Sequence, residues 1–287
     1  MALPFLVLAT THKLGKEKMK KENYTGGYAL ITGATGGLGK AFAFALAKRR
    51  CKLILTGRSE EKLIALKNQL LENYAIADVV LFPADLSDGD SRYAMIEKIR
   101  SAGYKIRLLV NAAGVDVQKP LEDYTQEKIA FQCRVNFEAA VSLCRFAIDS
   151  RAERLEIVNV SSVSGIYPMP YFAIYSATKA ALTSFSVALR EELKGKNVAV
   201  CAILPGAMPT REDIKEQIKG QGLWGRLAAK SPESVAEYAL KAVRKNKAKT
   251  IVGFWNRLMR IGTMWLPLSL KLKFIAKRWS KISKDAF

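Results

Sequence analysis

The chain has 287 residues, about half of them apolar and a quarter charged, which is enough for one large domain with a substantial core. A formal net charge of +20 indicates anionic partners such as nucleotide phosphates or acidic lipids, although a solvated lysine-rich surface accounts for much of it. The only histidine, His12, lies in a polar N-terminal region, which excludes a histidine triad or histidine-rich metal site elsewhere. No metal site is predicted.

The four cysteines, Cys51, Cys133, Cys144 and Cys201, lie in apolar segments without CxxC spacing. This pattern favours buried free thiols in a reducing compartment such as the cytoplasm.

Residues 1–26 are predicted to be an N-terminal tail. Their apolar run, ALPFLVLA, is too short to span a bilayer, and it lacks the basic flank and cleavage site of a signal peptide. A loosely ordered tail and a membrane-surface anchor both fit, and either Met1 or Met19 could be the natural start.

Residues 28–32 (YALIT) predict a short strand, followed by a glycine-rich turn and a helix, KAFAFALAKRR. Glycines let the backbone approach a pyrophosphate closely, and a helix N-terminus presents unpaired N–H groups to it. A glycine turn alone is weak evidence, but its place between a strand and a helix indicates dinucleotide binding. The predicted cofactor-binding residues of this turn are Gly33, Thr35, Gly36, Gly37, Leu38 and Gly39.

A second strand at residues 52–56 ends at Gly57 and Arg58, where a dinucleotide fold faces the adenosine ribose. A carboxylate there would bind a 2′-hydroxyl, whereas an arginine can pair with a 2′-phosphate. Arg58 therefore favours NADP(H) over NAD(H); the alternative is a surface arginine that begins the next helix.

Strands and helices alternate through the rest of residues 27–253. Further strands are predicted at 78–82, 107–114, 155–160, 197–204 and 249–254, with helices at 90–102 and 232–245. A long helical region at 123–149 contains Asn136, a poor mid-helix residue that marks a kink, a buried hydrogen bond or a functional role. Residues 211–230 are a candidate mobile lid. The pattern predicts a single Rossmann-type α/β domain with a doubly wound parallel sheet and ligands at the carboxyl ends of its strands.

A proton-transfer site is predicted between Asn159 and Lys179. Tyr175 and Lys179 are four residues apart on one helix face, and Ser162 lies in the loop before them. An ammonium about 4 Å from the phenol favours the phenolate by roughly 4 kcal/mol, or about three pKa units as an upper figure. Ser162 would hydrogen-bond the substrate oxygen. A tyrosine and a lysine four apart also occur on ordinary amphipathic helices, so the glycine turn upstream decides the interpretation.

These motifs resemble those of the short-chain dehydrogenase/reductase family over roughly residues 26–255. TGATGGLG resembles its TGxxxGxG turn, NAAG its NNAG motif with Ala112 in place of the second asparagine, SS…YSATK its Ser/YxxxK site, and PGAMPT its PGxxxT loop. The resemblance implies that Ser162, Tyr175 and Lys179 are catalytic, and that Asn136 holds a water linked to Lys179. It also implies adenine contacts near Asp85 and a carboxamide contact at Thr210. The predicted cofactor-binding residues after Arg58 are Asp85, Leu86, Asn111, Ala112, Ala113, Gly114, Tyr175, Lys179, Pro205, Gly206 and Thr210.

The expected activity is NADP(H)-dependent reduction of a ketone or aldehyde, or oxidation of the alcohol, on an apolar substrate such as a 3-oxoacyl or steroid-like carbonyl. A catalytically silent nucleotide-binding scaffold or sensor is the alternative. No nucleic-acid partner is predicted, because the basic residues of the domain lack interleaved aromatics. The resemblance implies a homo-oligomer, either a dimer or a tetramer.

Residues 254–287 form a basic amphipathic extension with Asp285 as its only acidic residue, and Pro267 interrupts any helix there. Such a segment is typical of a membrane-surface helix. A helix packed over the substrate pocket or against another subunit fits the pattern equally well. Either arrangement favours a lipophilic substrate.

Overall fold

The computed structural model describes Tyr24, residues 26–76, 78–210, Ile214, Ile218 and residues 227–279. The predicted N-terminal tail up to residue 23, His12, most of the predicted lid and the end of the C-terminal extension lie outside the described residues.

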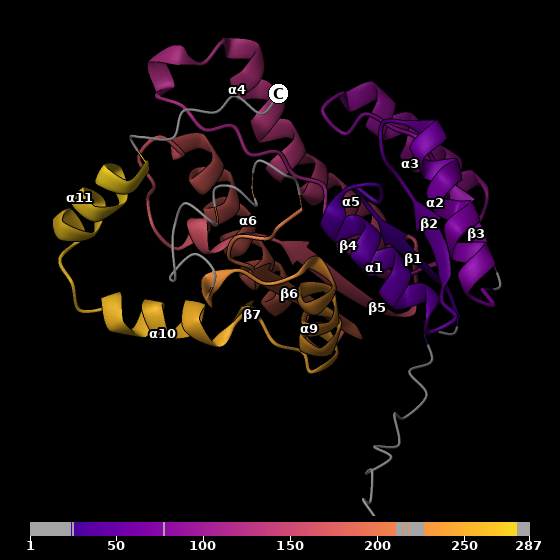
Figure 1. The fold of residues 1–287 in the computed structure, drawn as a ribbon. Coiled ribbons are helices and arrows are strands. Elements are labelled where there is room, and N and C mark those ends of the chain that lie inside the picture. Colours follow the sequence, from indigo (N-terminus) through magenta and orange to yellow (C-terminus); the bar gives the residue numbers. More distant parts are fainter. Residues whose placement is uncertain are drawn as a thin grey trace, which may run out of the picture.

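A seven-stranded parallel sheet forms the centre of the molecule, in the order β3-β2-β1-β4-β5-β6-β7 (Figure 1). Its strands are β1 (Tyr28–Ile31), β2 (Lys52–Leu55), β3 (Val79–Leu81), β4 (Ile106–Asn111), β5 (Arg151–Val160), β6 (Val198–Leu204) and β7 (Lys249–Ile251). The order changes direction between β1 and β4, which is the switch point where such sheets bind ligands. The predicted doubly wound α/β fold is confirmed.

Helices cover both faces of the sheet. They are α1 (Gly37–Ala47), α2 (Glu60–Asn73), α3 (Gly89–Ser101), α4 (Gln126–Cys133), α5 (Ala139–Asp149), α6 (Ala173–Glu192), α9 (Pro232–Arg244), α10 (Phe254–Thr263) and α11 (Leu268–Trp279), with the short turns η1 (Leu121–Asp123), η2 (Arg134–Glu138) and η3 (Val163–Gly165). Apolar residues of α1, α2 and α9 pack on one face, and those of α3, α5 and α6 pack on the other. Along β1, Ala29 and Ile31 face the first layer and Leu30 the second, so both faces of the strand are buried.

The structure differs from the prediction in several places. The strands predicted at 107–114 and 249–254 end earlier, at Asn111 and Ile251. Strand β5 begins at Arg151, four residues before the predicted 155, because this polar stretch pairs with the start of β4 beyond a bulge. The helical region predicted for 123–149 is divided into α4, the π-helical turn η2 and α5, with Asn136 inside η2. Cys133 is exposed, so the prediction of four buried thiols is wrong there; Cys51, Cys144 and Cys201 are buried and free.

The C-terminal extension forms two helices beside α6 and β7, at the end of the sheet away from α2 and α3 (Figure 1). Helices α10 and α11 are separated at Pro267, where the sequence predicts a break. Within the described part of the chain, every helix is too short or too polar to cross a bilayer.

Candidate active site

A cleft of about 720 Å³ opens at the carboxyl ends of the strands, which is a usual size for a small-molecule site. The cleft brings together the glycine turn, the end of β4, the loop before α6, the loop after β6 and helices α10 and α11. The predicted site residues that line it are Gly33, Gly36, Gly37, Leu38, Gly39, Ala112, Gly114, Ser162, Tyr175, Lys179, Pro205, Gly206 and Thr210.

The glycine turn is packed too tightly for side chains. A Cβ on Gly39 would lie 2.0 Å from the Gly33 carbonyl oxygen, and one on Gly37 would lie 2.7 Å from Cγ2 of Thr210. Gly33 adopts a positive φ of 58° against the backbone of Ala113. Helix α1 then begins without a side-chain cap and without acidic residues in its first turn. Its unpaired N–H groups are therefore available to an anion.

The proposed proton donor, Tyr175, lies in the first turn of α6. The phenol hydrogen-bonds Ser162, and its ring contacts Phe172 edge to face at 5.2 Å between centroids. The turn η3 packs closely against α6, since a Cβ on Gly165 would lie 2.7 Å from the carbonyl carbon of Lys179. Ser161 adds a hydrogen bond of 2.7 Å from its Oγ to the Lys179 carbonyl. These contacts hold the serine loop against the helix.

Lys179 lies beneath Tyr175. The ammonium nitrogen is 5.7 Å from the phenol ring centroid and donates to the Val160 carbonyl oxygen at 2.9 Å. Lys179 is almost fully buried, and desolvation lowers its pKa to about 8 while the Asp116 carboxylate opposes that shift.

Burial raises the pKa of the Tyr175 phenol well above its usual value of 10, and the Asp116 charge raises it further. The hydrogen bond from Ser162 acts in the opposite direction. The expectation of a lowered phenol pKa is therefore not met in this structure, because desolvation and the Asp116 charge outweigh the hydrogen bond from Ser162. A phenol with a raised pKa carries its proton at neutral pH.

Asn136 lies in η2 and holds the segment that follows β4. Its Oδ1 accepts from the Val115 backbone N–H at 2.8 Å, and its Nδ2 donates to the Val115 carbonyl at 2.9 Å and to Thr178 Oγ1 at 3.2 Å. Gly114 lies between Asn136 and Lys179, since a Cβ there would be 3.2 Å from Lys179 Nζ and 3.5 Å from Asn136 Oδ1. Asn136 does not line the cleft itself, and the water predicted for it stays a prediction.

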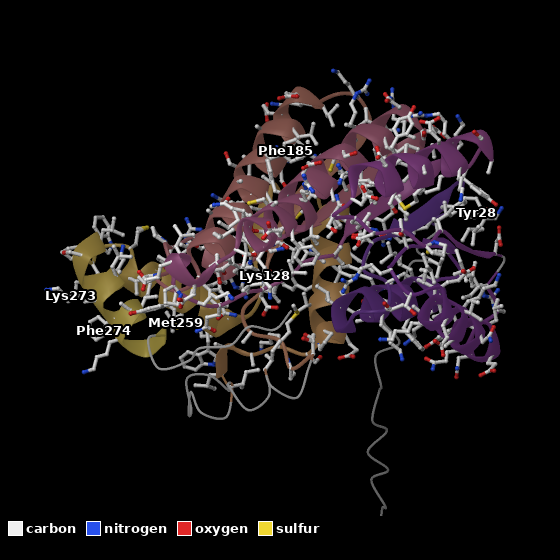
Figure 2. The ribbon with its side chains drawn as sticks, turned by 90° about the horizontal axis from the view of Figure 1, so that it is seen from above. Tyr28, Lys128, Phe185, Met259, Lys273 and Phe274 are labelled. Carbon is white, nitrogen blue, oxygen red and sulfur yellow. The ribbon has the colours of Figure 1, made fainter. Side chains whose placement is uncertain are left out.

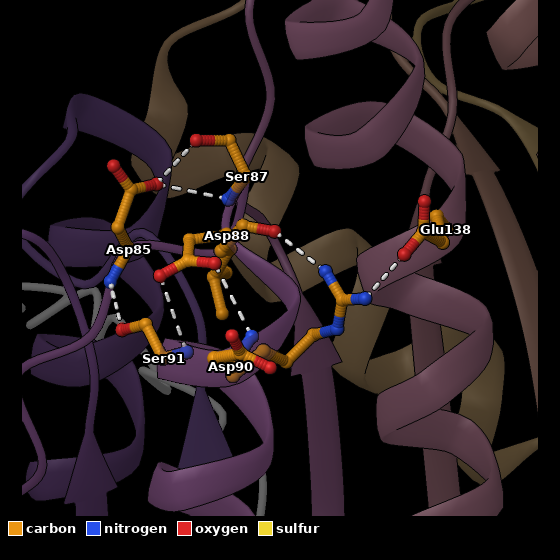
Figure 3. Close-up of polar contacts among 8 residues, drawn as sticks. Asp85, Ser87, Asp88, Asp90, Ser91 and Glu138 are labelled. Atoms are coloured by element: carbon orange, nitrogen blue, oxygen red, sulfur yellow. Dashed lines mark hydrogen bonds and ion pairs between the residues drawn. The ribbon is translucent and has the colours of Figure 1, made fainter.

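Several predicted cofactor residues lie outside the cleft lining. Asn111 is buried and donates to Asn159 Oδ1 at 2.8 Å, while Leu86 packs in the core. Ala113 packs behind Gly33. The Asp85 carboxylate accepts from the backbone and hydroxyl of Ser87 at 2.8 and 2.7 Å (Figure 3).

Thr35 of the glycine turn and Arg58 after β2 also lie outside the cleft lining. Arg58 is exposed after β2, and the Thr35 side chain lies 3.5 Å from the position of a Cβ on the adjoining Gly57. The two residues thus flank the tip of β2, where the ribose phosphate of a dinucleotide is expected.

The short chain dehydrogenase model matches residues 27–219. The chain belongs to this family. The resemblance seen in its motifs is thereby confirmed.

Relatives in the family carry reductase names. A dehydrogenase/reductase SDR family protein 7-like from Anopheles gambiae is 30% identical over 260 residues, or 86% of this chain and 81% of the relative. A very-long-chain 3-oxoacyl-CoA reductase from Bos taurus is 33% identical over 231 residues, or 77% and 69%. The solved structure of L-sorbose reductase from Gluconobacter frateurii, complexed with NADPH and L-sorbose, superposes with a TM-score of 0.72 at 27% identity, covering 80% and 96% of the two chains.

Asp116 is a cleft residue that the motifs do not reveal. It follows NAAG by two positions, lines the cleft, and its charge raises the pKa of both Tyr175 and Lys179. Its place five residues after the end of β4 is the one sequence signal that could have identified it, because ligands gather at the carboxyl ends of parallel strands.

Proposed function

We propose that this short chain dehydrogenase is an NADPH-dependent reductase of an apolar ketone or aldehyde, able to oxidise the corresponding alcohol in reverse. The observation that carries the proposal is the position of the Tyr175 phenol, which lies with Ser162 and Lys179 in a cleft that the glycine turn also lines. Asn136, Ser162, Tyr175 and Lys179 are the proposed catalytic group.

The chemistry supplied by bound NADPH is the transfer of a hydride to the carbonyl carbon. Tyr175 gives its phenolic proton to the oxygen of that carbonyl, because the forming alkoxide is a much stronger base than a phenolate. Ser162 hydrogen-bonds the same oxygen and fixes its direction. Lys179 supplies positive charge below the phenolate that remains, and Asn136 keeps the Val115 backbone in place beside it.

The residues around the glycine turn fit a nucleotide with a 2′-phosphate. The tight glycines leave the N-terminus of α1 open to a pyrophosphate, and Arg58 beside Thr35 offers a positive charge without a competing carboxylate in the sequence Thr56-Gly57-Arg58. L-sorbose reductase, whose structure was solved with NADPH, is similar over most of this chain.

The cleft favours a lipophilic substrate. Met169, Phe172 and Met208 line it, together with Leu266 and Phe274 of the C-terminal extension. A relative is named as a very-long-chain 3-oxoacyl-CoA reductase. We therefore place a 3-oxoacyl chain first and a steroid-like ketone second. The buried free thiols suit a reducing compartment, the cytoplasm, and the assembly is proposed to be a dimer or tetramer.

Replacement of the phenol tests the proposal. In Tyr175→Phe, NADPH oxidation with a 3-oxoacyl thioester or an apolar ketone is expected to fall by about 10²- to 10⁴-fold, because the proton donor is lost. NADPH binding, followed by nucleotide fluorescence, should persist. Tyr171→Phe, four residues earlier and outside the cleft lining, is the matched control. Retained turnover in Tyr175→Phe would remove the phenol from the mechanism.

The second candidate is a nucleotide-binding scaffold without turnover. A panel of ketones, aldehydes and 3-oxoacyl thioesters with NADPH separates the two functions. Tight NADPH binding with no oxidation across the whole panel would support the scaffold and contradict the reductase.

A further inference from the structure

Helix α10 presents its polar face to the protein. Asn256 is buried and donates to the Ala228 and Val252 carbonyl oxygens at 3.0 and 2.8 Å. Thr263 shares a hydrogen bond of 2.8 Å with the hydroxyl of Tyr167 in the serine loop. These residues and Arg260 all line the cleft, and their spacing of four and three positions places them on one side of the helix.

The opposite face of α10 is apolar and faces outward. Phe254, Leu258 and Ile261 are 61%, 44% and 61% exposed, and Trp265, directly beyond the helix, is 85% exposed. Their spacing of four, three and four positions makes one continuous stripe. A surface helix of a globular protein normally turns its apolar face to the core and its polar face to water. The outward apolar face of α10 is therefore suited to an apolar surrounding.

The stripe continues around the entrance of the cleft. Met259, Leu266 and Phe274 line the cleft and are also 40%, 38% and 68% exposed. Figure 2 shows Phe274 and Lys273 at the outer edge of the molecule, with Met259 on the neighbouring helix. The exposed apolar surface and the rim of the cleft are therefore the same surface.

The charge on this surface identifies its partner. Residues 254–277 contain five basic residues and no acidic one: Arg257, Arg260, Lys271, Lys273 and Lys277. Arg257 and Lys273 are exposed beside the apolar stripe. A second copy of the chain would bring an equally basic face against this one, which Coulomb repulsion opposes. The phosphates of anionic phospholipids complement it, with the apolar side chains entering the interface.

We propose that the α10–α11 face docks on the surface of an anionic phospholipid bilayer, with the rim of the cleft against the lipid. An apolar substrate then exchanges between the cleft and the bilayer without crossing water. This second statement rests on the proposed reductase function, whereas the docking does not.

Vesicle co-sedimentation of the full chain tests the docking. The protein should pellet with vesicles of phosphatidylcholine and phosphatidylglycerol, and at least tenfold less with phosphatidylcholine alone. An Ile261→Ser/Trp265→Ser double variant should lose tenfold or more of the partition coefficient, and Arg257→Gln/Lys273→Gln should lose a similar factor on anionic vesicles only. Leu71→Ser, at an exposed leucine of α2, is the matched control and should bind as the native chain does.

Equal binding by Ile261→Ser/Trp265→Ser and the native chain would overturn the proposal, as would the absence of binding to anionic vesicles. A molecular mass in solution that halves in the double variant, without vesicle binding by the native chain, would identify a second copy as the occupant. Quenching of native tryptophan fluorescence by brominated lipids gives a readout that needs no variant. The same assays on Tyr175→Phe separate docking from catalysis, since docking should be unchanged there.

Discussion

We expect the choice between NADPH and NADH to depend on Arg58. Its guanidinium is exposed at the tip of β2, free of the desolvation cost that a buried charge carries, and Thr35 stands beside the same tip. Hydrogen bonds to charged groups contribute about 1.5–3 kcal/mol each, which corresponds to a factor of about 10 to 150.

Arg58→Ala should therefore lower the preference for NADPH over NADH, measured as the ratio of kcat/KM values, by about 10- to 100-fold. The loss should fall on NADPH, since NADH lacks the phosphate. Arg151→Ala serves as the control, because it removes an exposed arginine at the amino end of β5, whereas Arg58 follows the carboxyl end of β2. An unchanged ratio in Arg58→Ala would exclude this arginine from phosphate recognition.

At the scale of elements, an ion pair fixes the π-helical turn that carries Asn136. Arg92 of α3 is buried, donates to the Leu86 carbonyl at 2.9 Å and pairs with Glu138 at the end of η2. Glu138 lies to one side of the Asp85–Ser91 cluster in Figure 3. The helix that follows β3 thus holds the segment whose Asn136 hydrogen-bonds Val115 and Thr178.

Glu138→Ala should lower kcat by about three- to tenfold through displacement of η2, with a smaller change in KM for NADPH. Stability should fall by only about 1 kcal/mol, because the glutamate is half exposed. Glu138→Gln retains an acceptor for Arg92 and should recover most of the activity. Loss of stability without a change in kcat would mean that the pair supports the fold alone.

Nothing in the sequence pairs Arg92 with Glu138, because 46 residues separate them and both are ordinary helix residues. Asn136 itself was recognisable as a misfit within a helix, although the sequence left a kink, a hydrogen bond and a functional role open. The structure contains both the irregular turn and the hydrogen bonds.

At the scale of the whole molecule, the candidate site costs stability. The folded-state pKa of Lys179 is about 8 against 10.5 for the free side chain, so folding disfavours its charged form. Below pH 8 both states hold the proton, and the penalty of about 3 kcal/mol is fully present. Between pH 8 and 10.5 the unfolded chain holds the proton and the folded chain does not, so stability rises with pH.

Lys179→Met should therefore be more stable than the native chain at pH 7, by about 2 kcal/mol after the lost hydrogen bond to Val160 is subtracted. The difference should shrink as the pH is raised to 9.5. Urea unfolding of the variant and the native chain at pH 7 and pH 9.5 measures this difference in stability. The buried cysteines titrate alike in both proteins, so their contribution cancels when the two stabilities are subtracted. A less stable variant at pH 7 would show that the ammonium is better solvated than its burial indicates.

The sheet could be predicted because its strands are short apolar runs separated by helices, and such runs fit a parallel sheet buried on both faces. The polar start of β5 at Arg151 could not, since only its pairing with β4 makes it a strand. For the C-terminal helices, the sequence left the orientation open. Their amphipathic pattern defines two faces but does not say which one meets the protein, and Asn256 and Thr263 settle that through tertiary hydrogen bonds.

Contact between the loop after β6 and helix α10 has a consequence for divergence within the family. A Cβ on Gly206 would lie 2.7 Å from Nδ2 of Asn256, and the Ala228 carbonyl oxygen would be 3.0 Å from it. No larger residue can replace this glycine while the asparagine holds its two carbonyl partners. Positions 206 and 256 should therefore covary among homologues. Homologues that keep the asparagine at 256 should keep the glycine at 206, and homologues that lose the asparagine should also accept larger residues at 206.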